Sequence, residues 1–402
     1  MNSSTGSDSV GDNSLDEGKA RDDDERDASQ TYTLYGGQLS YFTGKVRAYL
    51  RWKAIPFTEV QADANVYREI ILPRVGFPVI PVVVTPAGET LQDSTDIIDT
   101  LEQRFVEPSV YPSTPVQKLA ALLFEVYGDE WLVIPAMHYR WHHNREWTIR
   151  EFGAFNAPNA TPEEQLAIGA KRAEPFAKAA VLLGAEPHMH AAIEASYESL
   201  LHELDAHFAT LPYLFGSRPS IGDFGLIGPL YAHQYRDPAS GDLMRKLAPN
   251  VVHWVERMQQ PAAPRAGEFL ADDRIPETLL PVLTRMMREQ VPVLVDSVRL
   301  LREWIAQHPN ERIPRAIGMH RFELEGTVGQ RIVRPYSLWM LQRARRFYLS
   351  LEGEAKAAAD RLLDAVGGEA FKNFPDPPPL ERDGLSVKLA DEGDGRRATG
   401  DG

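Results

Sequence analysis

The segment 79–94, VIPVVVTPAGETLQDS, indicates how the first part of this chain folds. It opens with a run of β-branched residues, and the Pro-Ala-Gly sequence at 86–88 is a turn signal that leads into the short extended sequence Glu-Thr-Leu. Ser94 is expected to cap a helix that continues to about Phe105 with its apolar residues on one face. The segment therefore predicts a β-hairpin followed by a helix.

The residues before this segment add a strand, a helix and a second strand. Residues 31–35 are rich in β-forming side chains, and between Tyr41 and Trp52 apolar residues recur at three- and four-residue spacing. Residues 57–60 have the composition of a strand, and a short irregular helix is expected at 64–72. This order of elements predicts a small α/β domain over residues 31–108.

From Thr114 onward the pattern changes to consecutive helices. Helical periodicity covers 115–145, 162–183, 187–209, 220–235 and 248–259, which predicts an all-α domain over residues 114–261. A mainly helical extension is expected over 262–373, with helices at 276–307 and 336–366 around a β-hairpin of strands 321–324 and 330–333. The first of these helices carries a stripe too apolar to face water, and we expect it to pack on the helical domain.

Composition excludes several classes of function. The 402 residues contain no cysteine, which excludes disulfides, thiolate metal sites and a cysteine nucleophile. The 43 Lys and Arg against 57 Asp and Glu give a net charge of −14. Because binding to phosphate backbones needs clustered cations, nucleic acid is not expected as the main partner.

Both ends of the chain are expected to be disordered. Residues 1–30 hold nine acidic and three basic side chains with few apolar ones, and residues 374–402 hold seven acidic and four basic. The first residues lack the basic and apolar regions of a secretory signal, and no apolar run approaches the ~18–20 residues of a membrane span. These features predict a cytoplasmic protein that does not cross a membrane.

Four short motifs, in their order and spacing, resemble those of cytosolic glutathione transferases. They are SYFTGKVR at 40–47, Ile-Pro-Val-Val at 80–83, Asp-Ser at 93–94, and Ser-Ile-Gly-Asp at 220–223, which is a capping-box pattern. The resemblance covers about residues 31–260. It implies a thioredoxin-like α/β domain followed by an all-α domain, with glutathione as co-substrate and no metal.

The resemblance also implies where glutathione binds. Ile80 would pair its backbone with the cysteinyl part of the tripeptide beside a cis Pro81, because a cis X–Pro bond bares a backbone edge. Asp93 and Ser94 would hold the γ-glutamyl group. A carboxylate suits an ammonium, while a hydroxyl at a helix N-terminus suits a carboxylate. By charge alone, Arg74 or Lys45 is assigned to the glycyl carboxylate.

Two hydroxyl groups compete for the role of stabilising the glutathione thiolate. In the resembling family the leading residue of the first motif, here Ser40, contacts the sulfur, whereas Tyr41 stands where a proline is usual. A phenol performs the same task in other branches of the family. The plain alternatives are that Ser40 is only an N-cap and that Tyr41 is a packed aromatic.

The predicted activity is attack of the glutathione thiolate on a small apolar electrophile, as in a detoxifying transferase. The wall of the acceptor site is assigned to Tyr127, Trp131 and Tyr139 on the aromatic helix at 115–145, although about half of those aromatics are expected in the core. A non-catalytic binding or assembly module is the alternative function. The resemblance makes a homodimer an expected assembly.

Histidines at 138 and 142 are spaced so that one helical face can carry both. No matching third ligand accompanies them in the sequence, so the sequence predicts no metal site there. We expect these histidines to face solvent or to line a cleft.

Overall fold

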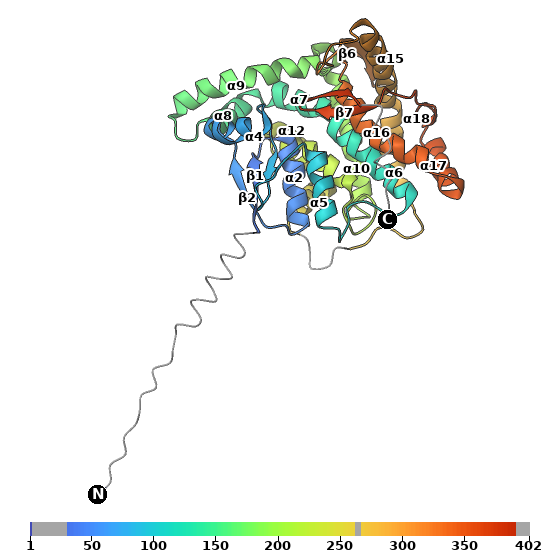
Figure 1. The fold of residues 1–402 in the computed structure, drawn as a ribbon, viewed down its shortest axis with the longest axis horizontal. Helices are drawn as coiled ribbons and strands as arrows, with labels where there is room; N and C mark the ends of the chain where they lie inside the picture. The colour runs from blue at the N-terminus through green and yellow to red at the C-terminus, as the bar shows by residue number, and fades with distance from the viewer. Residues whose placement is uncertain (2–29, 262–266, 391–402) are drawn as a thin grey trace.

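The computed structural model describes residues 1, 30–261 and 267–390. Its N-terminal domain is built on a sheet of four strands in the order β2-β1-β3-β4, with β1 parallel to β2 and antiparallel to β3. The strands are β1 (Tyr32–Gly36), β2 (Phe57–Gln61), β3 (Val82–Val84) and β4 (Thr90–Gln92). Helices α2 (Tyr41–Trp52) and α5 (Ser94–Arg104) lie side by side (Figure 1). The predicted thioredoxin-like arrangement is confirmed.

Short helical pieces connect β2 to β3, where the sequence predicts an irregular helix. They are α3 (Ala64–Val66), the π-helical turn η1 (Tyr67–Ile71) and α4 (Leu72–Val75). Gly76 ends α4 with a φ of +87°, which a residue without Cβ adopts at no steric cost.

The second domain is helical, as predicted. It comprises α6 (Pro115–Val126), η2 (Tyr127–Trp131), α7 (Val133–His138), η3 (Tyr139–His143), α8 (Arg145–Asn156), α9 (Pro162–Leu182), η4 (Pro187–Met189), α10 (His190–Phe208), α11 (Ile221–Pro229), η5 (Leu230–Tyr235), α12 (Pro238–Leu247) and α13 (Pro249–Met258). The single helix predicted at 115–145 is interrupted by the π-helical turns η2 and η3. Pro135 has no N–H for the carbonyl four residues earlier, and the helix widens into η2 just before it.

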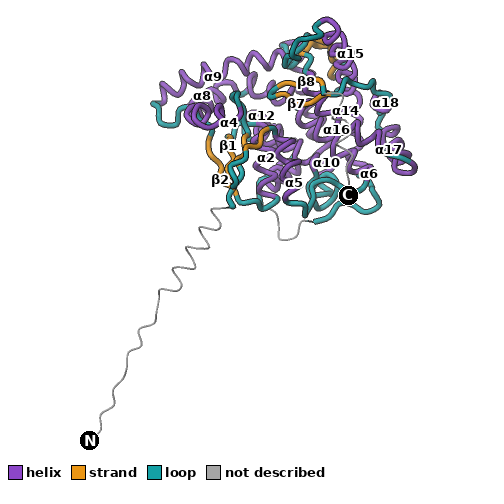
Figure 2. Tube along the Cα trace, in the orientation of Figure 1, coloured by secondary structure: helices purple, strands orange, loops and turns teal. Residues whose placement is uncertain are grey.

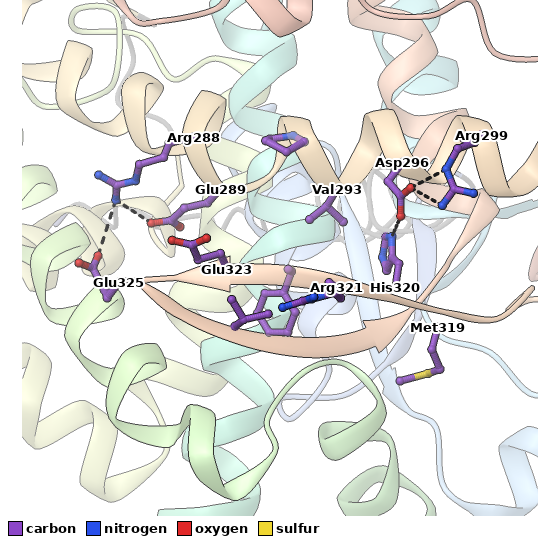
Figure 3. Close-up of a pocket in the computed structure, with 14 residues that line it drawn as sticks. Arg288, Glu289, Val293, Asp296, Arg299, Met319, His320, Arg321, Glu323 and Glu325 are labelled. Carbon is purple, nitrogen blue, oxygen red and sulfur yellow. Dashed lines mark hydrogen bonds and ion pairs between the residues drawn. The ribbon is translucent and has the colours of Figure 1, made fainter.

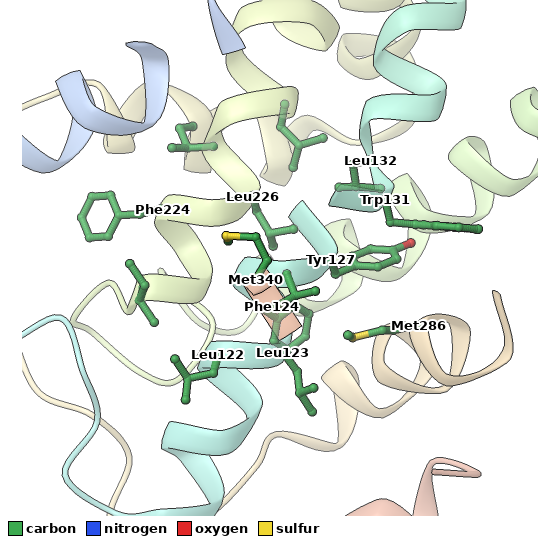
Figure 4. Packing of buried hydrophobic residues seen from close by; sticks show 14 of the residues in the cluster. Leu122, Leu123, Phe124, Tyr127, Trp131, Leu132, Phe224, Leu226, Met286 and Met340 are labelled. Atoms are coloured by element: carbon green, nitrogen blue, oxygen red, sulfur yellow. The ribbon is translucent and has the colours of Figure 1, made fainter. Parts of the chain in front are cut away.

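The extension packs on the helical domain, which confirms the predicted contact. Its elements are η6 (Glu277–Leu279), α14 (Leu280–Glu289), α15 (Val291–Gln307), β5 (Met319–Leu324), β6 (Thr327–Ile332), α16 (Pro335–Ser350), α17 (Gly353–Ala365), α18 (Glu369–Lys372), β7 (Leu380–Asp383) and β8 (Ser386–Leu389). Met340 of α16 lies beside Phe124, and Met286 of α14 lies near Tyr127 (Figure 4). One continuous hydrophobic core therefore joins the extension to α6 and η2.

The β5–β6 hairpin is present with a shorter turn than predicted. Leu324 pairs with Thr327, so the turn is Glu325-Gly326 alone and residues 327–329 belong to the strand. Both turn residues have positive φ, +47° and +74°, as a two-residue type I′ turn requires.

The prediction that residues 374–402 are a disordered tail is wrong for residues 380–389. There β7 and β8 form an antiparallel hairpin, in which Leu380 and Val387 are buried. The side-chain amide of Gln342 both donates to and accepts from the backbone of Leu380. Figure 2 shows this hairpin between the N-terminal sheet and α16. Each of these strands has only four residues, and an alternating pattern this short does not indicate a hairpin within a segment of acidic composition.

The remaining tail predictions, for residues 2–29 and 391–402, fall outside the described residues. Among the helices of the described ranges, none combines the length and apolar character that crossing a bilayer demands.

Candidate functional site

A cavity of about 120 Å³ lies where the two domains and the extension meet, and we call it the interdomain cavity. The N-terminal domain contributes Phe42, Val79, Ile80, Pro81, Gln92, Asp93, Ser94 and Thr95 to its lining, η2 contributes Asp129 and Glu130, and the extension contributes Arg315, Arg334, Tyr336, Met340, Gly384 and Leu385. Four residues assigned to glutathione binding from the sequence thus meet at one cavity.

The first pair, Ile80 and Pro81, lies just before β3. The bond between them is cis, as the resemblance implied. The pairing of β3 with β4 begins at Val82, so the backbone of Ile80 precedes the hydrogen-bonded ladder and faces the cavity. An extended peptide docked here would meet strand-like backbone at the edge of the sheet.

The second pair lies at the start of α5. Asp93, rather than the predicted Ser94, is the N-cap, because its Oδ1 accepts hydrogen bonds from the N–H groups of Thr95 at 2.9 Å and Asp96 at 3.3 Å. Its backbone has φ +80° and ψ 131°, a region that costs a non-glycine residue of order 1–3 kcal/mol. Backbone strain held at a cavity marks Asp93 as a candidate functional residue.

Ser94 is the first residue of α5 and is 5% exposed. It lines the cavity at the positive end of the helix dipole, where the dipole and a hydroxyl favour an anion.

The extension closes the opposite side of the interdomain cavity. The Tyr336 hydroxyl donates to Asp93 Oδ2, and the Arg334 guanidinium lies 3.4 Å from the Glu130 carboxylate. Burial and the Asp93 charge raise the pKa of Tyr336, so its hydroxyl keeps the proton that it donates. Arg382 of β7 donates to Asp96 at 2.7 Å and to the Gln92 carbonyl at 3.2 Å. These contacts fasten the extension across the start of α5.

Ser40 and Tyr41 do not line the cavity, whereas Phe42, the second residue of α2, does. Ser40 is the N-cap of α2, and its Oγ accepts from the Thr43 N–H at 3.2 Å. The Tyr41 hydroxyl donates to the Gly128 carbonyl, and its ring packs against His233. Burial raises the pKa of Tyr41 well above its usual value. Tyr41 thus occupies the position of the packed-aromatic alternative, and Ser40 that of the N-cap.

Neither cation assigned to the glycyl carboxylate reaches the cavity. Lys45 is fully buried, and its Nζ lies 2.7 Å from Glu125 and 2.6 Å from Asp129, so its charge is already compensated. Arg74 is exposed and donates to the carbonyl of Gly88 at 3.3 Å. Sequence charge alone cannot show that the residue one turn into α2 points into the protein. Arg315 and Arg334 of the extension are the arginines that line the cavity.

The assigned acceptor wall belongs to the hydrophobic core. Tyr127, Trp131 and Tyr139 are between 1% and 5% exposed, and none of them lines the interdomain cavity. The indole N–H of Trp131 donates to Glu289 of α14 at 3.2 Å. Phe322 of the extension packs on Trp131, and Tyr197 of α10 packs on Tyr139, so these rings lie in the core and not at the interdomain cavity.

A buried charge cluster lies beneath the cavity and connects all three regions. Lys45 and Arg343 of α16 bind opposite oxygens of Glu125, at 2.7 and 2.6 Å. These two cations lower the pKa of Glu125, whereas burial raises the pKa of Asp129 to about 8. The cluster fixes α2, α6 and α16 to one another.

A larger cavity of about 960 Å³ lies within the extension, between α15 and the β5–β6 hairpin (Figure 3). Its charged groups are mostly paired: Arg288 with Glu289 and Glu325, and Asp296 with Arg299 and His320. None of the residues assigned to glutathione or to the acceptor lines it.

The fold and the cavity define the class of proteins with a thioredoxin-like domain followed by an all-α domain. Residues 34–109 match the family model of the glutathione S-transferase N-terminal domain, and residues 186–257 match that of the C-terminal domain. Over these two segments the chain resembles glutathione S-transferases, and it carries a C-terminal extension beyond them.

Solved structures are also similar to more than half of this chain. The β-etherase LigF from Sphingobium sp. strain SYK-6 is 19% identical with a TM-score of 0.42, over 58% of this chain and 96% of its own. A glutathione S-transferase from Methylobacterium radiotolerans, solved with glutathione sulfonate, is 20% identical with a TM-score of 0.34, over 60% and 100% of the two chains. A search of curated protein sequences found no significant match.

Proposed function

We propose that this protein binds reduced glutathione in the interdomain cavity and activates its thiolate for attack on a small apolar electrophile. The observation that carries the proposal is the meeting of Ile80, Pro81, Asp93 and Ser94 at one cavity, with Asp93 in a strained backbone conformation. Buried polar groups at this cavity, such as Ser94, which is 5% exposed, cost free energy unless a partner satisfies them.

Each charged part of the tripeptide has a partner in this arrangement. The γ-glutamyl ammonium pairs with Asp93, and its carboxylate with Ser94 and the N-terminus of α5. Arg315 is exposed beside the cavity and forms no ion pair within the described residues, so it is the proposed partner of the glycyl carboxylate. This role replaces the one assigned to Arg74 and Lys45.

The thiolate is proposed to lie at the N-terminus of α2, near Ser40. An unperturbed thiol has a pKa near 8.5 and is mostly protonated at neutral pH, so donors and a positive field must lower that pKa. The helix terminus supplies the field, and the Ser40 hydroxyl can donate to sulfur while accepting from the Thr43 N–H. Electrostatic stabilisation of the thiolate is the catalytic device.

A non-catalytic binding module is the second candidate, and the small size of the cavity favours it. Its volume of about 120 Å³ is well below the roughly 300–1,000 Å³ of typical ligand sites, and Tyr336 already occupies one oxygen of Asp93. In the transferase proposal, this part of the extension moves aside when glutathione enters.

Ser94→Ala is expected to weaken glutathione binding about tenfold, because a buried hydroxyl that meets a carboxylate contributes about 1–2 kcal/mol. Isothermal titration calorimetry measures the change. Ser199→Ala is the matched control, since Ser199 is a part-exposed helical serine that donates to the Ala195 carbonyl of its own helix. Equal affinities for the two variants would contradict the placement of glutathione at α5.

Tyr336→Phe is expected to tighten glutathione binding by several-fold. The substitution keeps the ring and removes the hydroxyl that competes with the ammonium for Asp93. Tyr235→Phe removes a hydroxyl that donates to Glu256 at a part-exposed site away from the cavity, and it serves as the control. Weaker binding in Tyr336→Phe would mean that the hydroxyl assists glutathione rather than excluding it.

A further inference from the structure

We propose that His138, His143 and Glu194 form a binding site for a divalent transition-metal ion of the Zn²⁺ type. The site lies in the helical domain, between η3 and the first turns of α10. It goes beyond the proposed glutathione function and reverses the expectation, from sequence, that the chain holds no metal.

The three side chains converge on one point. The Nε2 atoms of His138 and His143 lie 2.8 and 2.7 Å from the same carboxylate oxygen of Glu194. One ligand atom from each residue falls within 4.8 Å of the others. The two imidazole rings are nearly perpendicular, at 89°, with centroids 5.3 Å apart.

These dimensions are close to those of a filled site. Zn²⁺ binds histidine nitrogen and carboxylate oxygen at about 2.0–2.2 Å, which places neighbouring tetrahedral ligands about 3.3 Å apart. The histidine nitrogens and the Glu194 oxygen therefore need to separate by only about half an ångström when the ion enters. Side-chain rotation is sufficient for such a change.

The spacing of an ideal α-helix predicts the pair His138 and His142, not His138 and His143. Residues 139–143 form a π-helical turn, in which the Asn144 N–H donates to the Tyr139 carbonyl five residues earlier at 3.0 Å. The wider turn carries His143, rather than His142, to the carboxylate that His138 also meets. Glu194 comes from one turn into α10, 51 positions further along the chain.

The surroundings leave the site accessible to an ion. The His138 side chain is fully buried, whereas His143 and Glu194 are about one-third exposed and leave an entry path. His190 lies 4.5 Å from His138 and 4.2 Å from His142, measured between ring centroids. Two further imidazoles, His142 and His190, therefore lie within reach of the proposed site.

The donor set indicates the class of ion. Two or more imidazoles with one carboxylate and no thiolate suit Zn²⁺, Ni²⁺ and Co²⁺ rather than Mg²⁺ or Ca²⁺. Three protein ligands leave a fourth position for water, His142 or His190. A bound ion would fasten η3 to α10. It would also steady the Arg140 side chain of η3, which donates to the Leu39 carbonyl at 2.8 Å beside the start of α2.

Zinc titration of the chelator-stripped full-length protein, followed by calorimetry, tests the proposal. We expect one high-affinity Zn²⁺ per chain, with Kd in the micromolar range or below. His143→Asn and Glu194→Gln change part-exposed residues, and each is expected to weaken that site about a hundredfold. The controls are His188→Asn and His202→Asn, which change exposed histidines elsewhere in the chain and leave the affinity unchanged.

Thermal unfolding supplies a second readout that does not depend on enzyme activity. Saturating Zn²⁺ raises Tm for the wild-type protein and for both controls, because a ligand that binds only the folded state stabilises it. The increase is lost in His143→Asn and Glu194→Gln. A wild-type chain that binds Zn²⁺ only at millimolar concentration, or variants that keep the wild-type affinity, would overturn the proposal.

Discussion

Replacing Lys45 by methionine is expected to lower the free energy of unfolding by about 3–5 kcal/mol. Methionine fills a similar volume but has no ammonium group. The Lys45 Nζ lies 2.7 Å from Glu125 and 2.6 Å from Asp129, so both carboxylates lose this partner. Both carboxylates are at most 2% exposed, so water cannot replace the lost partner. Arg343 still binds Glu125 and limits the loss. Urea unfolding measures the change.

The control for this prediction is Lys178→Met. Lys178 forms an ion pair of 2.7 Å with Glu174 on the surface of α9, where its side chain is 73% exposed. Such pairs contribute about 0.3–0.5 kcal/mol, so this variant is expected to unfold almost as the wild type does. Similar losses for the two variants would show that the buried cluster does not stabilise the junction of α2, α6 and α16.

The second large effect is a loss of stability in mild acid that depends on His207. Burial lowers the pKa of His207 to about 4, from about 6.5 in the unfolded chain. Below pH 6.5 the His207 imidazole is protonated in the unfolded chain, whereas in the folded protein it stays neutral down to about pH 4. The contribution of neutral His207 to folding stability is therefore complete above pH 6.5 and is lost as the pH falls toward 4. Burial also lowers the pKa of His233 and His320, which act in the same direction.

Between pH 7 and pH 5, His207→Gln is expected to lose about 2 kcal/mol less folding stability than the wild type, because each pKa unit corresponds to 1.36 kcal/mol. The amide retains groups for the Thr278 hydroxyl, 2.8 Å away, and for the Tyr213 carbonyl. Comparing the variant with the wild type cancels opposing groups such as Asp223, whose pKa burial raises to about 6. His202→Gln, at an exposed position, should leave the pH dependence unchanged.

The sequence predicts the structural features that depend on a few neighbouring residues. The hairpin at β3–β4, the start of α5 and the capping box at Ser220 each combine a few neighbouring residues whose turn, strand or cap preference is local. These segments position Ile80, Pro81, Asp93 and Ser94, and for that reason these four assignments meet at one cavity.

The sequence does not predict the contacts that form when distant segments of the chain pack together. Tyr336 reaches Asp93 across 243 positions, and Arg382 reaches Asp96 across 286. Neither contact follows a spacing rule, because both depend on how the extension packs on the helical domain. The same packing buried Trp131 and Tyr127, which local pattern alone placed in a cleft. A π-helical turn, which the α-helical period does not describe, paired His138 with His143.

The central claim is that the interdomain cavity binds glutathione, and calorimetric titration with reduced glutathione and S-hexylglutathione tests it most directly. We expect binding in the micromolar to millimolar range and weaker binding of both ligands in Ser94→Ala. The hexyl derivative is expected to bind more tightly, because the proposed attack on an apolar electrophile requires an apolar region beside the sulfur. Absence of heat and of a thermal shift with either ligand, for both the wild type and Tyr336→Phe, would contradict the claim.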